Sequence, residues 1–185
     1  NNTQKLINFI GIAAGLNYLN ELHIIHRDIS LSSIVLDEHY YPRICNVMFK
    51  NVFTDLEKIA KVISTSIFTA PETFEKNEYT TKSEVYGFGM LVYILLTGNL
   101  PYQGLNGYKR MLKIINDETP ELTDDIKPCY QELIKSCWEH DSSKRPSFLV
   151  IVANLICNED FKEDVENKEE VINYIEMITN SSEIK

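Results

Sequence analysis

The stretch KSEVYGFGMLVYILL, residues 82–96, is the segment that decides the fold of this chain. It is strongly apolar, and Thr97-Gly98, which follows it, is typical of the end of a helix. We therefore predict one long helix over residues 82–96. A helix that is apolar on nearly every side belongs in the centre of a domain, so we expect the rest of the chain to pack around it.

The N-terminal segment also carries a helical pattern. Its apolar residues recur at spacings of three and four, namely at Leu6, Phe9, Ala13, Leu16 and Leu19. This periodicity predicts a helix over residues 3–22, with Thr3 as its N-cap. Further helices are predicted over residues 105–116, 128–139, 147–157 and 165–178.

A small β-hairpin is predicted between these helices. Ile34–Leu36 and Arg43–Cys45 are β-prone runs separated by residues 37–42. Residues 24–31 are expected to form a loop, as are most of residues 46–72, with one helical turn near residues 55–63. The predicted fold class is therefore mainly α, with one small β-hairpin.

Length and charge limit the kinds of protein this can be. The chain has 185 residues, enough for one compact domain, with 44% apolar and 24% charged residues. Its net charge of −9 argues against a nucleic-acid partner, because phosphate binding needs clustered Lys and Arg. Residues 159–185 hold nine acidic residues and three Lys, so most of the charge belongs to a C-terminal extension. The chain does not begin with Met, and we interpret it as part of a longer protein.

The four Cys residues occur at positions 45, 129, 137 and 157 without any CxxC pair. We expect no zinc site, and we interpret these residues as small core side chains of a reduced, cytoplasmic protein. No apolar run approaches the roughly 18 residues that would span a bilayer, and no signal peptide is visible.

Four motifs follow one another in a recognisable order. They are Ile25-His26-Arg27-Asp28-Ile29, Ala70-Pro71-Glu72, Glu84–Leu91, and Cys137-Trp138 followed by Asp141 and Arg145-Pro146-Ser147-Phe148. In this order and spacing they resemble the C-terminal lobe of a protein kinase, with the closest similarity to the tyrosine-kinase-like group. The resemblance covers residues 3–157. It implies a helical bundle with a small β-hairpin over residues 1–157, followed by an acidic extension over residues 158–185.

The resemblance also implies parts that this chain lacks. A kinase needs an N-terminal lobe with a Gly-rich loop, but the chain has seven Gly and no Gly-x-Gly-x-x-Gly. The N-terminal lobe is therefore absent here, and we expect it upstream in a parent chain. ATP and magnesium are implied by the family alone, and we expect their binding by this chain to be weak or absent.

Two catalytic residues of the family are matched in the first motif. Asp28 corresponds to the Asp that accepts the proton of the substrate hydroxyl. Alternatively, Asp28 has lost this role and only forms hydrogen bonds within the loop. Arg27 resembles the Arg that contacts a phosphate on the activation segment. The alternative for that segment is a solvated loop rich in Ser and Thr.

Other catalytic positions depart from the family pattern. Ser33 stands where the family has an Asn that holds magnesium, and Asn46 stands where it has the magnesium Asp. Ser30 and Ser32 occupy the positions of the cations that face the transferred phosphate. If each loss costs about 2 kcal/mol of transition-state stabilisation, three losses together remove roughly four decades of rate. No metal ligand is therefore assigned in this chain.

The structural positions of the family survive better. The resemblance pairs Glu72 with Arg145 in an ion pair that holds the activation segment to the lobe. Glu84 replaces the Asp that caps the catalytic loop from the central helix, with one extra methylene. His26 is interpreted as a packed structural residue and Trp138 as a core residue.

Three functions remain open at this point. The leading hypothesis is a catalytically impaired kinase-like module that acts in signalling by binding or scaffolding a protein substrate or partner kinase. The alternative is an active ATP-dependent Ser/Thr or Tyr kinase with Asp28 as its base. The third is a fragment without independent function.

Overall fold

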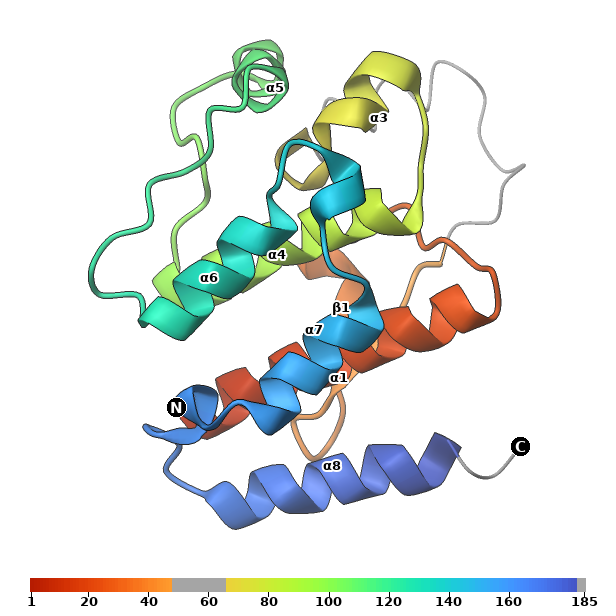
Figure 1. The fold of residues 1–185 in the computed structure, drawn as a ribbon, viewed down its shortest axis with the longest axis vertical. Coiled ribbons are helices and arrows are strands. Elements are labelled where there is room, and N and C mark those ends of the chain that lie inside the picture. The colour runs from red at the N-terminus through yellow and green to blue at the C-terminus, as the bar shows by residue number, and fades with distance from the viewer. Residues whose placement is uncertain (48–65, 183–185) are drawn as a thin grey trace.

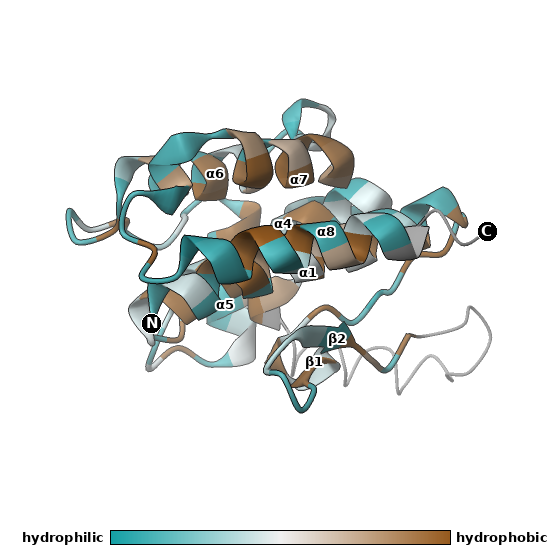
Figure 2. Ribbon diagram, turned by 90° about the horizontal axis from the view of Figure 1, so that it is seen from below, coloured by the Kyte–Doolittle hydropathy of each residue, from teal (hydrophilic) through white to brown (hydrophobic). Residues whose placement is uncertain are grey.

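The central helix that the apolar stretch predicted is present in the structure. A computed structural model describes residues 1–47 and 66–182, and in it α4 spans Thr81–Thr97 and runs through the middle of the molecule (Figure 1). Thr80 caps its N-terminus by accepting from the Ser83 amide, and Gly98 ends it at φ 71°. Gly tolerates this left-handed conformation without a Cβ penalty, which explains why the helix stops there. Hydrophobic residues are concentrated on α4 and α7 (Figure 2).

The N-terminal helix α1 spans Asn2–Glu21, as the periodicity predicted, but its cap differs. Asn1 is the N-cap, and its side chain accepts from the Gln4 amide at 2.8 Å. The prediction of Thr3 as N-cap was wrong. Its hydroxyl is used instead by two residues far along the chain, Glu166 and Asn167.

The hairpin consists of β1, Ile34–Leu36, and β2, Pro42–Ile44, paired antiparallel. The second strand begins one residue earlier than predicted, because Pro42 pairs with Leu36 and a proline is tolerated at the first position of a strand. The hairpin packs directly on α1. A Cβ added at Gly15 would lie 2.7 Å from Ile44 Cδ1, so the absence of a side chain there lets helix and strand approach.

Three further helices agree with the sequence to within a few residues: α5 Gly107–Ile115, α6 Pro128–Cys137 and α7 Phe148–Cys157. Helix α3, Pro71–Lys76, was missed, because residues up to 72 were expected to be loop. The helical turn expected near residues 55–63 lies outside the described residues. None of the described helices is both long and apolar enough to cross a membrane.

The acidic C-terminal segment folds onto the lobe. Phe161 is buried against Tyr130, with ring centroids 4.9 Å apart, and α8, Lys168–Ser182, lies along α1 (Figure 1). The sequence had placed this helix at residues 165–178. Tyr174 on α8 is buried and packs 4.6 Å from the Tyr41 ring of the hairpin. The tail thus contacts both α1 and the hairpin.

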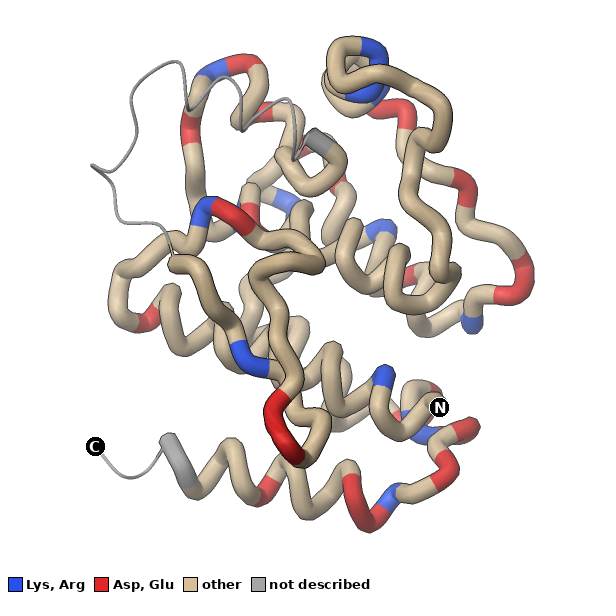
Figure 3. Tube along the Cα trace, turned by 180° about the vertical axis from the view of Figure 1, so that it is seen from behind, with Lys and Arg blue, Asp and Glu red and all other residues tan. Residues whose placement is uncertain are grey.

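Charged groups attach the turn before α8 at two places. The Glu166 carboxylate accepts from the Thr3 amide and hydroxyl, each at 3.0 Å, and from the Asn2 amide at 3.2 Å. Lys127 Nζ lies 2.7 Å from the Asp164 carboxylate. Acidic residues gather around this turn, with Lys residues among them (Figure 3). The turn therefore closes the N-terminus of α1, where the helix dipole favours a negative charge.

We expect Glu166 to make the fold less stable at acid pH than at neutral pH. Hydrogen bonds from the backbone amides of Thr3, Glu166 itself and Asn2 lower the pKa of the Glu166 carboxyl to about 2, from the unfolded value of 4.5. A carboxyl group whose pKa is lower in the folded state than in the unfolded state stabilises the fold at pH values above its unfolded pKa. The contribution of Glu166 is therefore lost as pH falls from 4.5 toward 2. Urea unfolding at several pH values should show a loss below pH 4.5 that is smaller in Glu166→Gln. Glu176→Gln, an exposed carboxylate on α8, is the control, and equal pH profiles for all three proteins would contradict the prediction.

Candidate active site

The loop after α1 is held in place by His26. Its side chain is fully buried, its Nε2 donates to the Cys45 carbonyl at 2.8 Å, and its Nδ1 accepts from the Asp28 amide at 3.2 Å. A carbonyl can only accept and an amide can only donate, so these two bonds define the neutral tautomer with the proton on Nε2. His26 thus links the loop that carries Asp28 to the end of β2.

Glu84 attaches the same loop to the central helix. Its side chain is 4% exposed, and its Oε1 accepts from the Arg27 amide at 2.9 Å. Arg27 adopts a left-handed backbone conformation, at φ 69°, which is unfavourable for a residue with a Cβ. Burial raises the pKa of Glu84 to about 7, although the bonds to the loop amides and the Arg27 charge act in the opposite direction.

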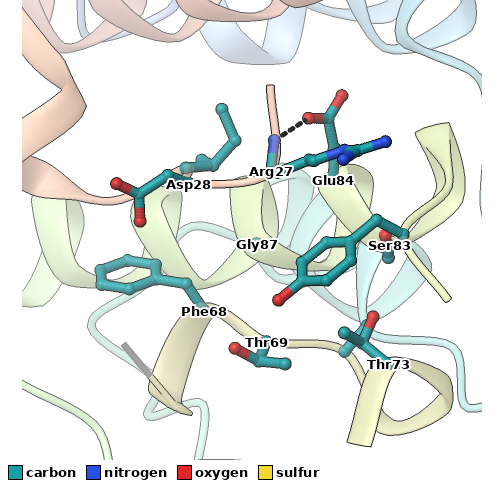
Figure 4. A pocket seen from close by; sticks show the side chains of 11 residues that line it. Arg27, Asp28, Phe68, Thr69, Thr73, Ser83, Glu84 and Gly87 are labelled. Atoms are coloured by element: carbon teal, nitrogen blue, oxygen red, sulfur yellow. Dashed lines mark hydrogen bonds between the residues drawn. The ribbon is translucent and has the colours of Figure 1, made fainter. Parts of the chain in front are cut away.

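Asp28 lines a small cavity between the loop and the segment before α3. The cavity has a volume of about 40 Å³, and Phe68, Thr69 and Thr73 face Asp28 and Arg27 across it (Figure 4). A cavity needs at least about 10 to 15 Å³ of such space to hold a water molecule, so this one is large enough for a water or a hydroxyl group. The space beside Asp28 can therefore admit a hydroxyl group.

Tyr79 also lines this cavity, and no sequence motif predicts a role for it. Burial raises the pKa of Tyr79, and the negative charge of Asp28 raises it further. Tyr79 lies on the segment between α3 and α4, and nothing in its sequence context places it next to Asp28. Only the packing of that segment against the loop shows it.

Ser33 is buried within a turn of the loop. Its Oγ accepts from the Ser30 amide at 3.0 Å and donates to the Ser30 carbonyl at 2.9 Å, and the residue is fully buried. Ser30 and Ser32 share a hydrogen bond between their hydroxyls at 2.9 Å. The Ser33 hydroxyl thus supports the 3-10 turn Leu31–Ser33 and is not presented as a metal ligand.

Asn46 lies at the end of the hairpin and is exposed, at φ 63°. Its Nδ2 donates to the Ser32 carbonyl at 3.4 Å. Among residues 1–47 and 66–182, no group of three or more His, Cys, Asp or Glu side chains could hold a metal ion. Magnesium prefers charged oxygen ligands in octahedral geometry, so the neutral Asn46 amide and the engaged Ser33 hydroxyl do not fit a magnesium site of the family type.

Replacing Ser33 by alanine tests whether its hydroxyl is structural. The change leaves the buried Ser30 amide without its acceptor, and we expect the free energy of unfolding to fall by about 1 to 3 kcal/mol. Ser32→Ala, at an exposed neighbour, is the matched control, with a change within about 0.5 kcal/mol. An unchanged stability of Ser33→Ala together with weaker metal-dependent nucleotide binding would show that Ser33 is a ligand instead.

Arg145 is the most heavily bonded side chain near the site. It is fully buried and forms two bonds with Glu72, from Nη1 to Oε1 at 2.7 Å and from Nη2 to Oε2 at 2.9 Å. Its guanidinium also donates to three backbone carbonyls, those of Lys82, Glu139 and His140, and stands 5.1 Å from the Tyr86 ring. The ion pair expected from the sequence therefore connects α3 to the segment before α7.

Trp138 lies in the core, where the sequence placed it. It is 3% exposed and packs 5.6 Å from Tyr93. A Cβ added at Gly89 would approach Cys137 Cβ at 2.7 Å and the Trp138 ring at 2.9 Å. The small residue on α4 thus allows α6 to pack closely, which also holds the segment that carries Arg145.

The family can be assigned on this geometry. A sequence model described as protein tyrosine and serine/threonine kinase matches residues 1–155, and the mostly helical lobe with its two-stranded hairpin agrees with it. The chain belongs to this protein kinase family. The tail helix α8 lies beyond the matched residues.

Individual relatives carry kinase names. A "probable serine/threonine-protein kinase" of Dictyostelium discoideum is 37% identical over 145 residues, which cover 77% of this chain and 16% of the relative. A second kinase of that organism is 34% identical, covering 74% and 10%. The serine/threonine/tyrosine-protein kinase HT1 of Arabidopsis thaliana is 31% identical, covering 79% and 38%. The chain thus spans less than two fifths of each of these relatives.

Proposed function

We propose that this chain is the C-terminal lobe of a kinase-like domain of the tyrosine-kinase-like group that acts mainly by binding, with impaired phosphate transfer. The observation that carries the proposal is the state of the two metal positions. The Ser33 hydroxyl is buried in a turn, and Asn46 offers a neutral amide where a carboxylate is needed. The structural positions, by contrast, keep their bonds, as the Glu72–Arg145 pair illustrates. A scaffold that retains its bonds is suited to binding a protein substrate or a partner kinase in signalling.

An upstream lobe is part of this proposal. The catalytic loop and hairpin expose apolar side chains, with Leu31 42% exposed and Val35 and Leu36 each 49% exposed. Adjacent exposed apolar residues favour a surface that another part of the protein covers. We propose that an N-terminal lobe packs here in the parent chain. The cytoplasmic location remains a prediction from the sequence.

The second candidate is an active protein kinase. Asp28 lines a cavity that is large enough for a hydroxyl group, and the relatives are named as serine/threonine or serine/threonine/tyrosine kinases. In this case Asp28 accepts the proton of the substrate hydroxyl as the oxygen attacks the γ-phosphate of ATP, and the bond to the β-phosphate breaks with ADP as the leaving group. His26 and Glu84 orient the loop through its backbone.

Phosphate transfer by a chain extended to include the upstream lobe separates the two candidates. The assay uses ATP with magnesium and, separately, with manganese, and compares the natural sequence with Asp28→Asn. We expect no transfer, or transfer that is indifferent to Asp28. Transfer that disappears in Asp28→Asn would establish the active kinase and overturn the binding proposal.

Thermal unfolding addresses the third possibility, a fragment without function. We expect a cooperative transition, because the buried core is continuous from α1 through α4 to α8. A broad, non-cooperative melt of both the 185-residue chain and the extended chain would favour the fragment.

A further inference from the structure

A cleft lies between the segment that follows α5 and the C-terminal end of α6. Its volume of about 380 Å³ falls within the range of about 300 to 1,000 Å³ that ligand-binding pockets have. The two walls approach each other where His140 Nδ1 stands 3.6 Å from Asp117 Oδ1. Among the described residues, none that lines this cleft also lines the cavity beside Asp28. The cleft is therefore a separate candidate site, and phosphate transfer makes no use of it.

The floor of the cleft is apolar and rigid. Trp138, Pro120 and Leu122 line it, and Trp138 is held in the core by its contact with Tyr93. Arg and Lys side chains commonly lay their methylene groups on an apolar surface of this kind and keep the charged end in a polar setting.

The segment that forms one wall is acidic. Residues 117–125 contain five Asp or Glu and no Lys or Arg, and the acidic positions recur along this segment in Figure 3. Glu118 is paired with Lys113 at 2.5 Å, whereas Glu121 and Asp124 form no ion pair with any described residue. On the opposite wall, Glu139 lines the cleft and is exposed. The walls therefore carry carboxylates that a cation from outside can pair with.

The negative potential of this segment extends to the floor of the cleft. Burial raises the pKa of Tyr93, and the charges of Asp125 and Glu121 raise it further. The Tyr93 ring lies 5.6 Å from the ring of Trp138. Lys135 is the lining residue of opposite sign, but it is exposed, and its long flexible side chain can turn into solvent.

We propose that this cleft binds a basic segment of a partner protein. The charged end of an Arg or Lys side chain pairs with Asp117 and Glu139, and its methylene groups lie on Trp138. Arg suits the site better than Lys, because its planar fork can bond a carboxylate through two parallel hydrogen bonds. The inference goes beyond the proposed function, and it holds for an impaired kinase and for an active one.

The single Trp of the chain makes the cleft easy to observe. Trp138 lines the cleft, so the one indole signal in the ¹H–¹⁵N nuclear magnetic resonance spectrum of the 185-residue chain reports on it. The probes are three capped peptides of the same pattern that carry Arg, Gln or Glu at two positions on either side of a leucine. We expect the Arg peptide alone to shift the indole signal and the Asp117 and Glu139 amides along one saturable curve. Its affinity should fall several-fold between about 50 mM and about 500 mM sodium chloride, because salt screens exposed charges.

Two neutral substitutions test the carboxylates directly. Asp117→Asn combined with Glu139→Gln should weaken binding of the Arg peptide about five-fold, as expected for the loss of two exposed ion pairs. Both changes preserve the backbone: Asn tolerates the left-handed conformation at position 117, where φ is 59°, and the carbonyl of residue 139 still accepts from Arg145. Glu169→Gln combined with Glu176→Gln removes two exposed carboxylates of α8 and is the matched control, with unchanged affinity.

Lys135→Gln provides a test of sign, because removing this cation should tighten binding of the Arg peptide about two-fold. Weaker binding in this variant, or preferential binding of the Glu peptide, would assign the cleft to an acidic partner and overturn the proposal. Equal weakening in the α8 control would show that only net charge matters. The absence of any saturable shift at millimolar Arg peptide would refute the site. Should a variant fail to fold, an affinity of the natural chain that is indifferent to salt would refute the charge pairing. None of these readouts depends on phosphate transfer by the extended chain.

Discussion

Replacing Arg145 by methionine should lower the free energy of unfolding by about 3 to 5 kcal/mol, since breaking one side of a buried ion pair leaves the other charge uncompensated. Arg145 is fully buried, and its partner Glu72 is 14% exposed at the side chain. The change also removes the donor from three backbone carbonyls. Urea-induced unfolding followed by circular dichroism measures the loss.

Lys144→Met is the matched control for this prediction. Lys144 is exposed and adjacent in sequence, so its removal should change the free energy of unfolding by less than about 0.5 kcal/mol. Adding Glu72→Gln to Arg145→Met should recover part of the loss, because it removes the stranded charge. A loss below about 1 kcal/mol in Arg145→Met would mean that the pair is not needed to hold α3.

Restoring a carboxylate by Asn46→Asp should increase magnesium-dependent nucleotide binding or phosphate transfer of the extended chain by about 30-fold, equivalent to about 2 kcal/mol. Asn46 is exposed and makes one long hydrogen bond to the Ser32 carbonyl, so the change disturbs little of the fold. A charged oxygen at this position supplies what magnesium prefers in a ligand. Calorimetric titration of nucleotide with and without magnesium, and a transfer assay, measure the gain.

Asn173→Asp adds the same charge on the exposed face of α8 and controls for net charge. It should leave binding and transfer unchanged. Any transfer gained by Asn46→Asp should disappear when Asp28→Asn is added, because proton acceptance would still be required. No gain in magnesium-dependent binding would contradict the proposal that the neutral amide at position 46 limits metal binding.

The tail helix gives the lobe a feature that the family match does not include. Residues 158–182 are bonded to the N-terminus of α1 through Glu166 and to the hairpin through Tyr174. The hairpin in turn carries Asn46 at its end and lies next to Ser33, whose carbonyl accepts from the Cys45 amide at 2.9 Å. The tail, the hairpin and the loop that carries Ser33 are therefore connected through direct contacts.

Much of this architecture follows from residue types alone. The apolar content of residues 82–96 and the periodicity of residues 3–22 indicated the central helix and α1, because burial of an apolar face dominates local structure. The Glu72–Arg145 pair was expected from the motifs in which the two residues occur. The sequence also determines that position 28 carries a carboxyl group and position 46 a neutral amide, and the fold cannot change these residue types.

Tertiary structure decided the rest, because the relevant partners are distant in the chain. Thr3 looked like a helix cap until Glu166, more than 160 residues away, was found bonded to its hydroxyl. The burial of the Ser33 hydroxyl, the place of Tyr79 beside Asp28 and the bond from the Arg27 amide to Glu84 likewise depend on which segments pack together. Sequence determined which chemical groups this protein has, whereas the packed fold determined which of them meet, because solvent exclusion and hydrogen-bond geometry exist only once the chain is folded.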